Sequence, residues 1–363
     1  MFKTGPSSEG KLKRVKPKDI KPTYVLKNEA ANRAIQELLA KAGPSDNDDL
    51  LAQMITTVLK LQDEKVDRGD LKILNTTLKE LRWAFRVFRP YRPIRKVSIF
   101  GSARTGKQDP NYRVAKQFGD FMAKSGWMVV TGGSSGIMQA GNEGAGPAQS
   151  FGANIRLPFE QAANPVIAND RKLINFKYFF TRKLIFVKES DAICLFPGGF
   201  GTLDEGFEVL TLIQTGKMMP RPIVMVDTRR GAYWSSWLAF MKRAILKSKM
   251  INPEDMSLFQ MVQSPREAHD VITRFYKHYH SMRFVGDLLV IRLEKMLQAR
   301  DLQKINRSFK DIILKGKIEP SGALSQELSE TDLIRLPRLV FAFNHKSYGR
   351  LKQMIDAINL MGG

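Results

Sequence analysis

Residues 192–205 read AICLFPGGFGTLDE, and their pattern indicates the architecture of the chain. The apolar run AICLF (192–196) predicts a short strand buried on both faces, as in the middle of a parallel sheet. The strand runs into the glycine-rich turn PGGFG, and helical spacing follows over residues 202–215. A buried strand that turns through glycines into a helix is typical of α/β folds.

Other apolar runs repeat this arrangement. They are residues 96–100 (KVSIF), 127–130 (WMVV), 152–157 (GANIRL) and 222–227 (PIVMVD). Helical stretches lie between the runs, for example over residues 112–125. The alternation predicts right-handed crossovers and a Rossmann-like, doubly wound parallel sheet over residues 95–280. Such sheets bind ligands beyond the carboxyl ends of their strands.

The flanking segments have a different character. Residues 1–28 hold eight basic and two acidic side chains and predict a flexible basic tail. Residues 29–94 predict a helical segment, with a helix capped by Ser45 or Asp46. An apolar stripe from Leu71 to Phe88 at spacings of three and four predicts a second helix, whose stripe forms core or an oligomer seam.

Residues 281–363 predict a small α/β appendage. Strands are expected at 288–293 and 339–343, helices at 302–314 and 348–358, and a polar loop at 316–331.

Composition limits the functional classes. The chain has 363 residues, a net charge of +22, one Cys and four His. A single Cys excludes a disulfide framework, and no apolar run approaches the roughly 18 residues of a membrane span. We expect a cytoplasmic protein with no metal, no cofactor and no membrane partner. Nucleic acid remains a possible partner but is not favoured, since the positive charge is spread along the chain.

Three glycine-rich turns follow three predicted strands: 101–106 (GSARTG), 131–138 (TGGSSGIM) and 197–205 (PGGFGTLDE). Glycines let the backbone approach a ligand closely, and the N–H groups at a helix start attract phosphate. None of the turns fits the P-loop or the strict dinucleotide fingerprint. They predict a phosphate or nucleotide site that includes Gly101, Ser102, Gly132, Gly133, Ser134, Gly136, Gly198, Gly199, Gly201 and Thr202.

Charged residues beside these turns suggest chemistry. Thr202 is expected to cap the helix that begins there, which favours a capping role for Asp204 as well. Glu205 is expected to hydrogen-bond ribose hydroxyls or to stabilise a cationic sugar. Arg182 can bind phosphate through two parallel hydrogen bonds, although a surface salt bridge is the alternative.

These residues resemble the Lonely Guy family over about residues 95–280. Residues 197–205 resemble the family motif PGGxGTxxE, and residues 131–138 resemble GGGxxGLM. Arg182 and Lys183 stand where the family has the end of MHxRK, and Gly101-Ser102 matches the turn after the first strand. The sequence departs from the pattern at Phe179-Phe180 and at Gln139, which leaves the substrate open.

The resemblance implies a homodimer or higher homo-oligomer with phosphoribohydrolase activity. A nucleoside 5′-monophosphate, AMP-like or a cytokinin riboside, would be split into free base and ribose 5-phosphate. It implies Arg182 and Glu205 as catalytic residues, with Lys183, the glycines and Thr202 binding substrate. Relatives are often labelled lysine decarboxylases, but the chain shows no pyridoxal-phosphate lysine signature. The alternative is a non-catalytic protein that binds a nucleotide or molybdenum cofactor.

Overall fold

The computed structural model describes residues 24–157, 162–229 and 231–361. Residues 1–23, most of the predicted basic tail, lie outside this range. The chain divides into two compact units, Met1–Asn75 and Thr76–Gly363. Within the described range, no helix has both the length and the apolar content needed to cross a bilayer.

The first unit is helical, as expected. It contains α1 (Glu29–Ala42), α2 (Asp48–Asp63) and the start of α3 (Arg68–Phe88). Leu26, Ile35 and Leu39 form its small core and pack against α2.

The predicted cap of α2 is wrong by one or two residues, because the N-cap is Asn47. Ser45 and Asp48 instead stabilise the preceding turn, where the Ser45 N–H donates to the Asp48 carboxylate at 3.3 Å.

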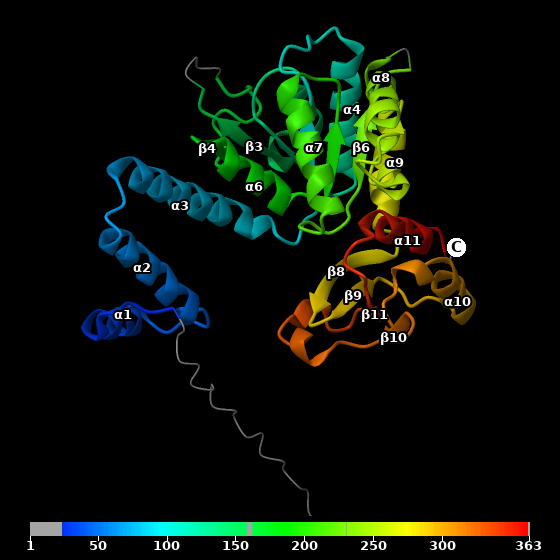
Figure 1. The fold of residues 1–363 in the computed structure, drawn as a ribbon. Helices are drawn as coiled ribbons and strands as arrows, with labels where there is room; N and C mark the ends of the chain where they lie inside the picture. Colours follow the sequence, from blue (N-terminus) through cyan, green and yellow to red (C-terminus); the bar gives the residue numbers. More distant parts are fainter. Residues whose placement is uncertain (1–23, 158–161, 230, 362–363) are drawn as a thin grey trace, which may run out of the picture. The chain divides into compact units, whose positions relative to one another are not determined.

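The second unit is built on a seven-stranded parallel sheet, which confirms the predicted α/β class (Figure 1). Its strands lie in the order β4-β3-β2-β1-β5-β6-β7. Their bounds are β1 Lys96–Phe100, β2 Met128–Thr131, β3 Ser150–Ile155, β4 Leu173–Phe176, β5 Ala192–Leu195, β6 Ile223–Val226 and β7 Gln260–Val262. The sequence analysis missed β4 and β7, which are short and partly exposed and so lack a continuous apolar run.

Helices cover both faces of this sheet. Alternation along β1 sends Val97 and Ile99 to one face and Phe100 to the other. The first face packs against α4 (Pro110–Lys124), α5 (Ile137–Ala145) and α9 (Pro265–Phe275). The second packs against α6 (Phe179–Glu189), α7 (Phe200–Gln214), α8 (Tyr233–Phe240) and the end of α3.

The apolar stripe on α3 serves two environments. Leu71, Leu74 and Leu78 are exposed. Farther along the stripe, Leu81 and Phe85 pack against the core and Phe88 is buried in it, with its ring stacked on Phe151 at 4.3 Å between centroids. Only the second half of the stripe is therefore core within the described chain.

The C-terminal part forms a four-stranded antiparallel sheet in the order β10-β11-β9-β8. It contains β8 Tyr279–Val285, β9 Leu288–Leu293, α10 Ala299–Ser308, η5 Lys310–Ile312, β10 Glu319–Ser321, η6 Ser325–Glu327, β11 Arg338–Ala342 and α11 Tyr348–Leu360. The helix expected at 302–314 begins earlier and ends at Ser308. The loop expected at 316–331 contains β10 and η6, which polar composition concealed.

Helix α11 lies between the two sheets (Figure 1). Asn359 accepts hydrogen bonds from the backbone of His278 and Tyr279, at 2.8 and 3.0 Å. At its other end, Tyr348 packs on Gly216 just beyond α7, where a Cβ would lie 2.2 Å from the tyrosine ring. The appendage is therefore joined closely to the parallel-sheet layer.

A buried charge cluster holds one face of the antiparallel sheet. Arg292 and Arg338 are cross-strand neighbours on β9 and β11. Glu327 accepts hydrogen bonds from both guanidinium groups, at 2.9 Å from Arg292 Nε and 3.0 Å from Arg338 Nε. Glu327 and Arg338 are both fully buried.

We predict that Glu327→Gln destabilises the fold strongly, because it leaves the fully buried Arg338 guanidinium without a counter-charge and leaves Arg292 with Glu330 alone. The expected loss in the free energy of unfolding is roughly 3–5 kcal/mol, measured by urea denaturation. Glu319→Gln, which neutralises an exposed carboxylate of the same sheet, is the control. A loss below about 1 kcal/mol for Glu327→Gln, the range of exposed pairs, would contradict this account.

Candidate active site

The predicted glycine turns meet where the strand order reverses. The chain runs outward from β1 to β4 on one side and from β5 to β7 on the other, so β1 and β5 flank the switch point. The Ser102 N–H donates to the Pro197 carbonyl at 3.1 Å, and the Ile137 N–H donates to the Ser102 carbonyl at 3.1 Å. Open α/β sheets bind ligands at this position.

Close packing of the turns requires several of the glycines. Gly136 has φ +65°, and a Cβ there would lie 2.2 Å from the Ser102 carbonyl oxygen. A Cβ on Gly198 would lie 2.1 Å from the Thr202 hydroxyl oxygen. By contrast, Cβ atoms on Gly199 or Gly201 would meet nothing within 4 Å. The first two glycines hold the turns together, while the last two leave the start of α7 open.

A cavity of about 770 Å³ opens at this junction. Eight of the predicted site residues line it: Gly101, Ser102, Arg182, Gly198, Gly199, Gly201, Thr202 and Glu205. The described residues Gly132, Gly133, Ser134, Gly136 and Lys183 are not part of its lining. The sequence analysis missed Arg104, Met138, Phe179 and Phe200, which also line it.

Helix α7 begins two residues earlier than predicted. Its first residue is Phe200, and Gly199 is the N-cap. The Gly199 carbonyl accepts hydrogen bonds from the N–H groups of Thr202 and Leu203 at 3.1 and 3.2 Å. Thr202 is therefore not the cap, and Asp204 lies in the second turn, which rules out the capping role expected for it. With no capping side chain on Gly199, the first N–H groups of α7 are left for an anion.

The turn before α7 is fixed by the segment that follows β6 and by the start of α8. The Tyr233 hydroxyl donates to the Gly198 carbonyl at 2.6 Å. Asp227, just after β6, accepts hydrogen bonds from the backbone of Thr228 and Tyr233, each at 2.9 Å. These contacts orient the peptide between Gly198 and Gly199, and no local sequence signal pointed to Tyr233.

Glu205 is a buried carboxyl group at the base of the cavity. Its residue is only 4% exposed. Burial raises the pKa of Glu205 to about 7, against the opposing effect of the Lys183 and Arg182 charges. A carboxyl group that titrates near neutrality suits proton transfer at physiological pH.

Lys183 neutralises the acidic side chains of α7. Its amine lies 2.8 Å from Asp204, 2.9 Å from Glu208 and 3.6 Å from Glu205. Because the Lys183 amine already pairs with these carboxylates, Lys183 acts here as an internal counter-ion.

Arg182 faces the cavity without an ion-pair partner among the described residues. Its Nε is buried and makes no hydrogen bond. The guanidinium carbon lies 5.7 and 5.3 Å from the ring centroids of Phe179 and Phe186. A Cβ on Gly132 would lie 2.6 Å from the Met138 sulfur and 3.4 Å from the Arg182 terminal nitrogen, so Gly132 makes room chiefly for Met138. The surface salt bridge considered for Arg182 is absent from the described residues.

Glu80, on α3, fixes the start of the helix that carries Arg182. One carboxylate oxygen accepts from the Lys177 N–H and the other from the Thr181 hydroxyl, both at 2.6 Å. A carboxylate beside the first turn of α6 also interacts favourably with the helix dipole. Sequence reasoning missed this contact, because about a hundred residues separate the partners.

Asn164 holds the second glycine turn. Its N–H donates to the Gly133 carbonyl at 2.8 Å, and its side-chain amide donates to the Ser134 carbonyl at 3.2 Å. The same amide donates to Asn142 at 3.0 Å, which in turn accepts from Thr131 at 2.7 Å. The second turn is thus a rigid support beside the cavity.

Comparison with known proteins gives the following similarities. Residues 134–272 match the family described as "Possible lysine decarboxylase". The chain is 30% identical over 156 residues to the probable cytokinin riboside 5′-monophosphate phosphoribohydrolase LOGL5 of Oryza sativa subsp. japonica, covering 42% of this chain and 61% of that protein. It is 28% identical over 156 residues to the cytokinin riboside 5′-monophosphate phosphoribohydrolase LOG3 of Arabidopsis thaliana, covering 42% and 69%. The resemblance of the α/β core to the Lonely Guy family is confirmed.

Among solved structures, the molybdenum cofactor binding protein of Rippkaea orientalis is 23% identical, with a TM-score of 0.36. The match covers 50% of this chain and 96% of the Rippkaea orientalis chain. DNA processing protein A of Streptococcus pneumoniae is 11% identical, with a TM-score of 0.32, over 66% and 88% of the two chains.

We predict that Glu205→Gln stabilises the protein in a pH-dependent way. The pKa of Glu205 lies above the ordinary 4.5, so between about pH 4.5 and 7 the folded chain keeps a proton that the unfolded chain releases. The free energy of unfolding therefore falls as the pH rises through this window. The amide should add about 2–3 kcal/mol at pH 8 and little at pH 4.

Thermal unfolding of both proteins at the two pH values measures this difference. Glu208→Gln, one turn along α7 and also bound to Lys183, is the matched control and should not stabilise the protein at pH 8, because it only removes an ion pair. An equal effect of Glu205→Gln at both pH values would contradict the raised pKa.

Proposed function

We propose, on the premise that the α/β core resembles that of Lonely Guy proteins, that this protein hydrolyses the N-glycosidic bond of a nucleoside 5′-monophosphate. The products are a free base and ribose 5-phosphate. The observation that carries the proposal is the pairing of buried Glu205 with unpartnered Arg182 in one cavity at the switch point. A site that only held phosphate would gain nothing from a buried carboxyl group beside it.

The substrate's phosphate is assigned to the start of α7. The open N–H groups there and the helix dipole attract the anion, and Gly199 and Gly201 allow close approach. Arg182 offsets the charge of the phosphate from α6. We assign the ribose to the space between the start of α7 and Glu205.

Glu205 acts on the ribose. Breaking the bond between C1′ and the base nitrogen leaves its electron pair on the base and builds positive charge on the sugar. The Glu205 carboxylate stabilises this charge and accepts a proton from the water that adds to C1′. The departing base takes up one proton and Glu205 afterwards releases the one it accepted, so that in sum one water is added across the broken bond.

The rim of the cavity suits a flat base. Phe179 is half-exposed and Phe200 is 94% exposed, and both line the cavity. Aromatic faces stack on planar rings, so these two side chains are assigned to the base rather than to the phosphate.

We predict base release from a panel of nucleoside 5′-monophosphates that includes AMP, followed by chromatography. Glu205→Gln should lower kcat by about 10²–10³-fold, because it removes the charge that stabilises the transition state. Glu208→Gln is the control and should retain activity. Equal release by Glu205→Gln would refute its assignment, and tight binding of a monophosphate without release would favour a binding protein.

We predict that kcat/KM for the preferred monophosphate rises with pH through about 7. Only the ionised form of Glu205 stabilises the sugar cation, and kcat/KM reports ionisation in the free enzyme. The substrate phosphate also ionises, with a pKa of about 6, so its own titration is measured separately. Once corrected for the phosphate, a profile that is flat between pH 6 and 8 would contradict a catalytic role for the raised pKa.

A further inference from the structure

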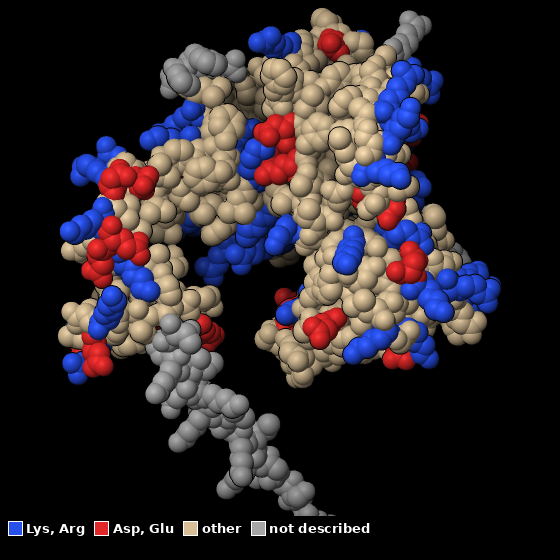
Figure 2. Space-filling model, in the orientation of Figure 1, with Lys and Arg blue, Asp and Glu red and all other residues tan. Residues whose placement is uncertain are grey.

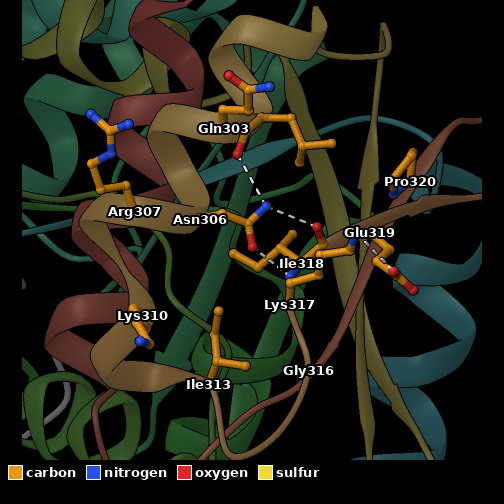
Figure 3. A pocket seen from close by; sticks show the side chains of 11 residues that line it. Gln303, Asn306, Arg307, Lys310, Ile313, Gly316, Lys317, Ile318, Glu319 and Pro320 are labelled. Carbon is orange, nitrogen blue, oxygen red and sulfur yellow. Dashed lines mark hydrogen bonds and ion pairs between the residues drawn. The ribbon is translucent and has the colours of Figure 1, made fainter.

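A second cavity lies in the C-terminal part, outside the catalytic site. It occupies about 660 Å³ between α10 and residues 313–320 (Figure 3). This volume falls within the range of small-molecule sites. The proposed function makes no use of it.

Asn306 holds the two sides of this cavity at a fixed distance. Its side-chain nitrogen donates to the carbonyls of Leu302 and Ile318, at 3.1 and 2.9 Å. Its side-chain oxygen accepts from the Ile318 N–H at 2.8 Å. Both N–H groups of the amide and its oxygen are therefore engaged within the protein. Asn306 has a structural role, and the groups that could bind a ligand are its neighbours.

Basic residues line the cavity on both sides. Arg307 and Lys310 belong to the helical side and Lys317 to the other, as Figure 3 shows. The one acidic residue in the lining, Glu319, lies 3.6 Å from Lys317. Within the described chain, Arg307 and Lys310 have no carboxylate within ion-pair distance.

Several other cations of the same subdomain are paired with carboxylates. Arg350 binds Asp311 at 2.8 Å, Lys352 binds Asp356 at 2.6 Å and Lys304 lies 3.6 Å from Asp301. Figure 2 shows Lys and Arg side chains gathered over α10. Unpaired cations that line a cavity, one of them a guanidinium, fit a phosphate group.

The rest of the lining is apolar. Leu302, Ile313, Ile318 and Pro320 supply carbon surface, and the amide of Gln303 makes no hydrogen bond within the described residues. A phosphate alone would not contact this apolar surface or bond the Gln303 amide. A ligand with both a phosphate and a flat ring uses all of them.

We propose that this cavity is a second binding site, for a small phosphorylated ligand of the nucleotide class. Arg307 and Lys310 bind its phosphates, the apolar side chains contact its ring, and Gln303 hydrogen-bonds the ring edge. A concave cavity of this size favours a single small molecule over the backbone of a nucleic acid.

The test is hydrogen–deuterium exchange of the full chain with ADP as the probe, at constant ionic strength. We expect protection of residues 302–320, separate from any protection of residues 198–205 in the catalytic cavity. The ADP concentration for half-protection should rise about tenfold or more in Arg307→Gln/Lys310→Gln, since two charge-assisted bonds are lost. Arg300→Gln/Lys304→Gln removes the same charge from α10 outside the cavity and should keep the wild-type affinity.

Several outcomes would overturn the proposal. They are no protection of 302–320 at saturating ADP, equal weakening by both double variants, or protection by inorganic phosphate as strong as that by ADP. Protection by a single-stranded oligonucleotide but not by ADP would identify a nucleic-acid surface instead. Unchanged thermal unfolding of both variants confirms that any loss of binding is local.

Discussion

The hydrogen bond from the Ser102 N–H to the Pro197 carbonyl joins the turns that follow β1 and β5, and the rest of the site depends on it. Strands β1 and β5 are neighbours although about ninety residues separate them, and their turns meet because the strand order reverses between them. Contact at this distance leaves no room for side chains at Gly136 and Gly198. The same geometry opens the start of α7 toward the cavity, where an anion can approach.

Segments outside the parallel sheet hold the helices that carry the site. Glu80, at the end of the helical segment, binds the start of α6, which carries Arg182. Tyr348, on the C-terminal helix α11, packs on Gly216 just beyond α7, which carries Glu205. Arg350 on the same helix binds Asp311, next to Lys310 of the second cavity. The flanking segments therefore have a physical role in positioning α6 and α7.

Burying Glu205 and Arg182 at the candidate active-site cavity costs folding stability. Glu205 is buried deeply enough for its pKa to reach about 7, although Lys183 and Arg182 lie close by. The Arg182 guanidinium keeps a buried nitrogen without a partner. Under the proposed function, these groups would gain a partner when a phosphorylated sugar enters, as in a preorganised site. The charge cluster around Glu327 is the opposite case, because its carboxylate already bonds two guanidinium groups and is structural.

The sequence by itself determined the class of fold and the edge of the sheet where the site lies. Buried apolar runs and glycine turns are local patterns, and they predicted β1, β2, β3, β5 and β6 to within a few residues. The tertiary structure decided which predicted residues face the cavity. Lys183 lies next to Arg182 in the chain but binds the carboxylates of α7, while Gly132 makes room for Met138. The start of α7 at Phe200, the contact from Glu80 and the pKa of Glu205 all depend on residues far apart in the chain. Close approach and burial are properties of the packed chain, so no local pattern predicts them.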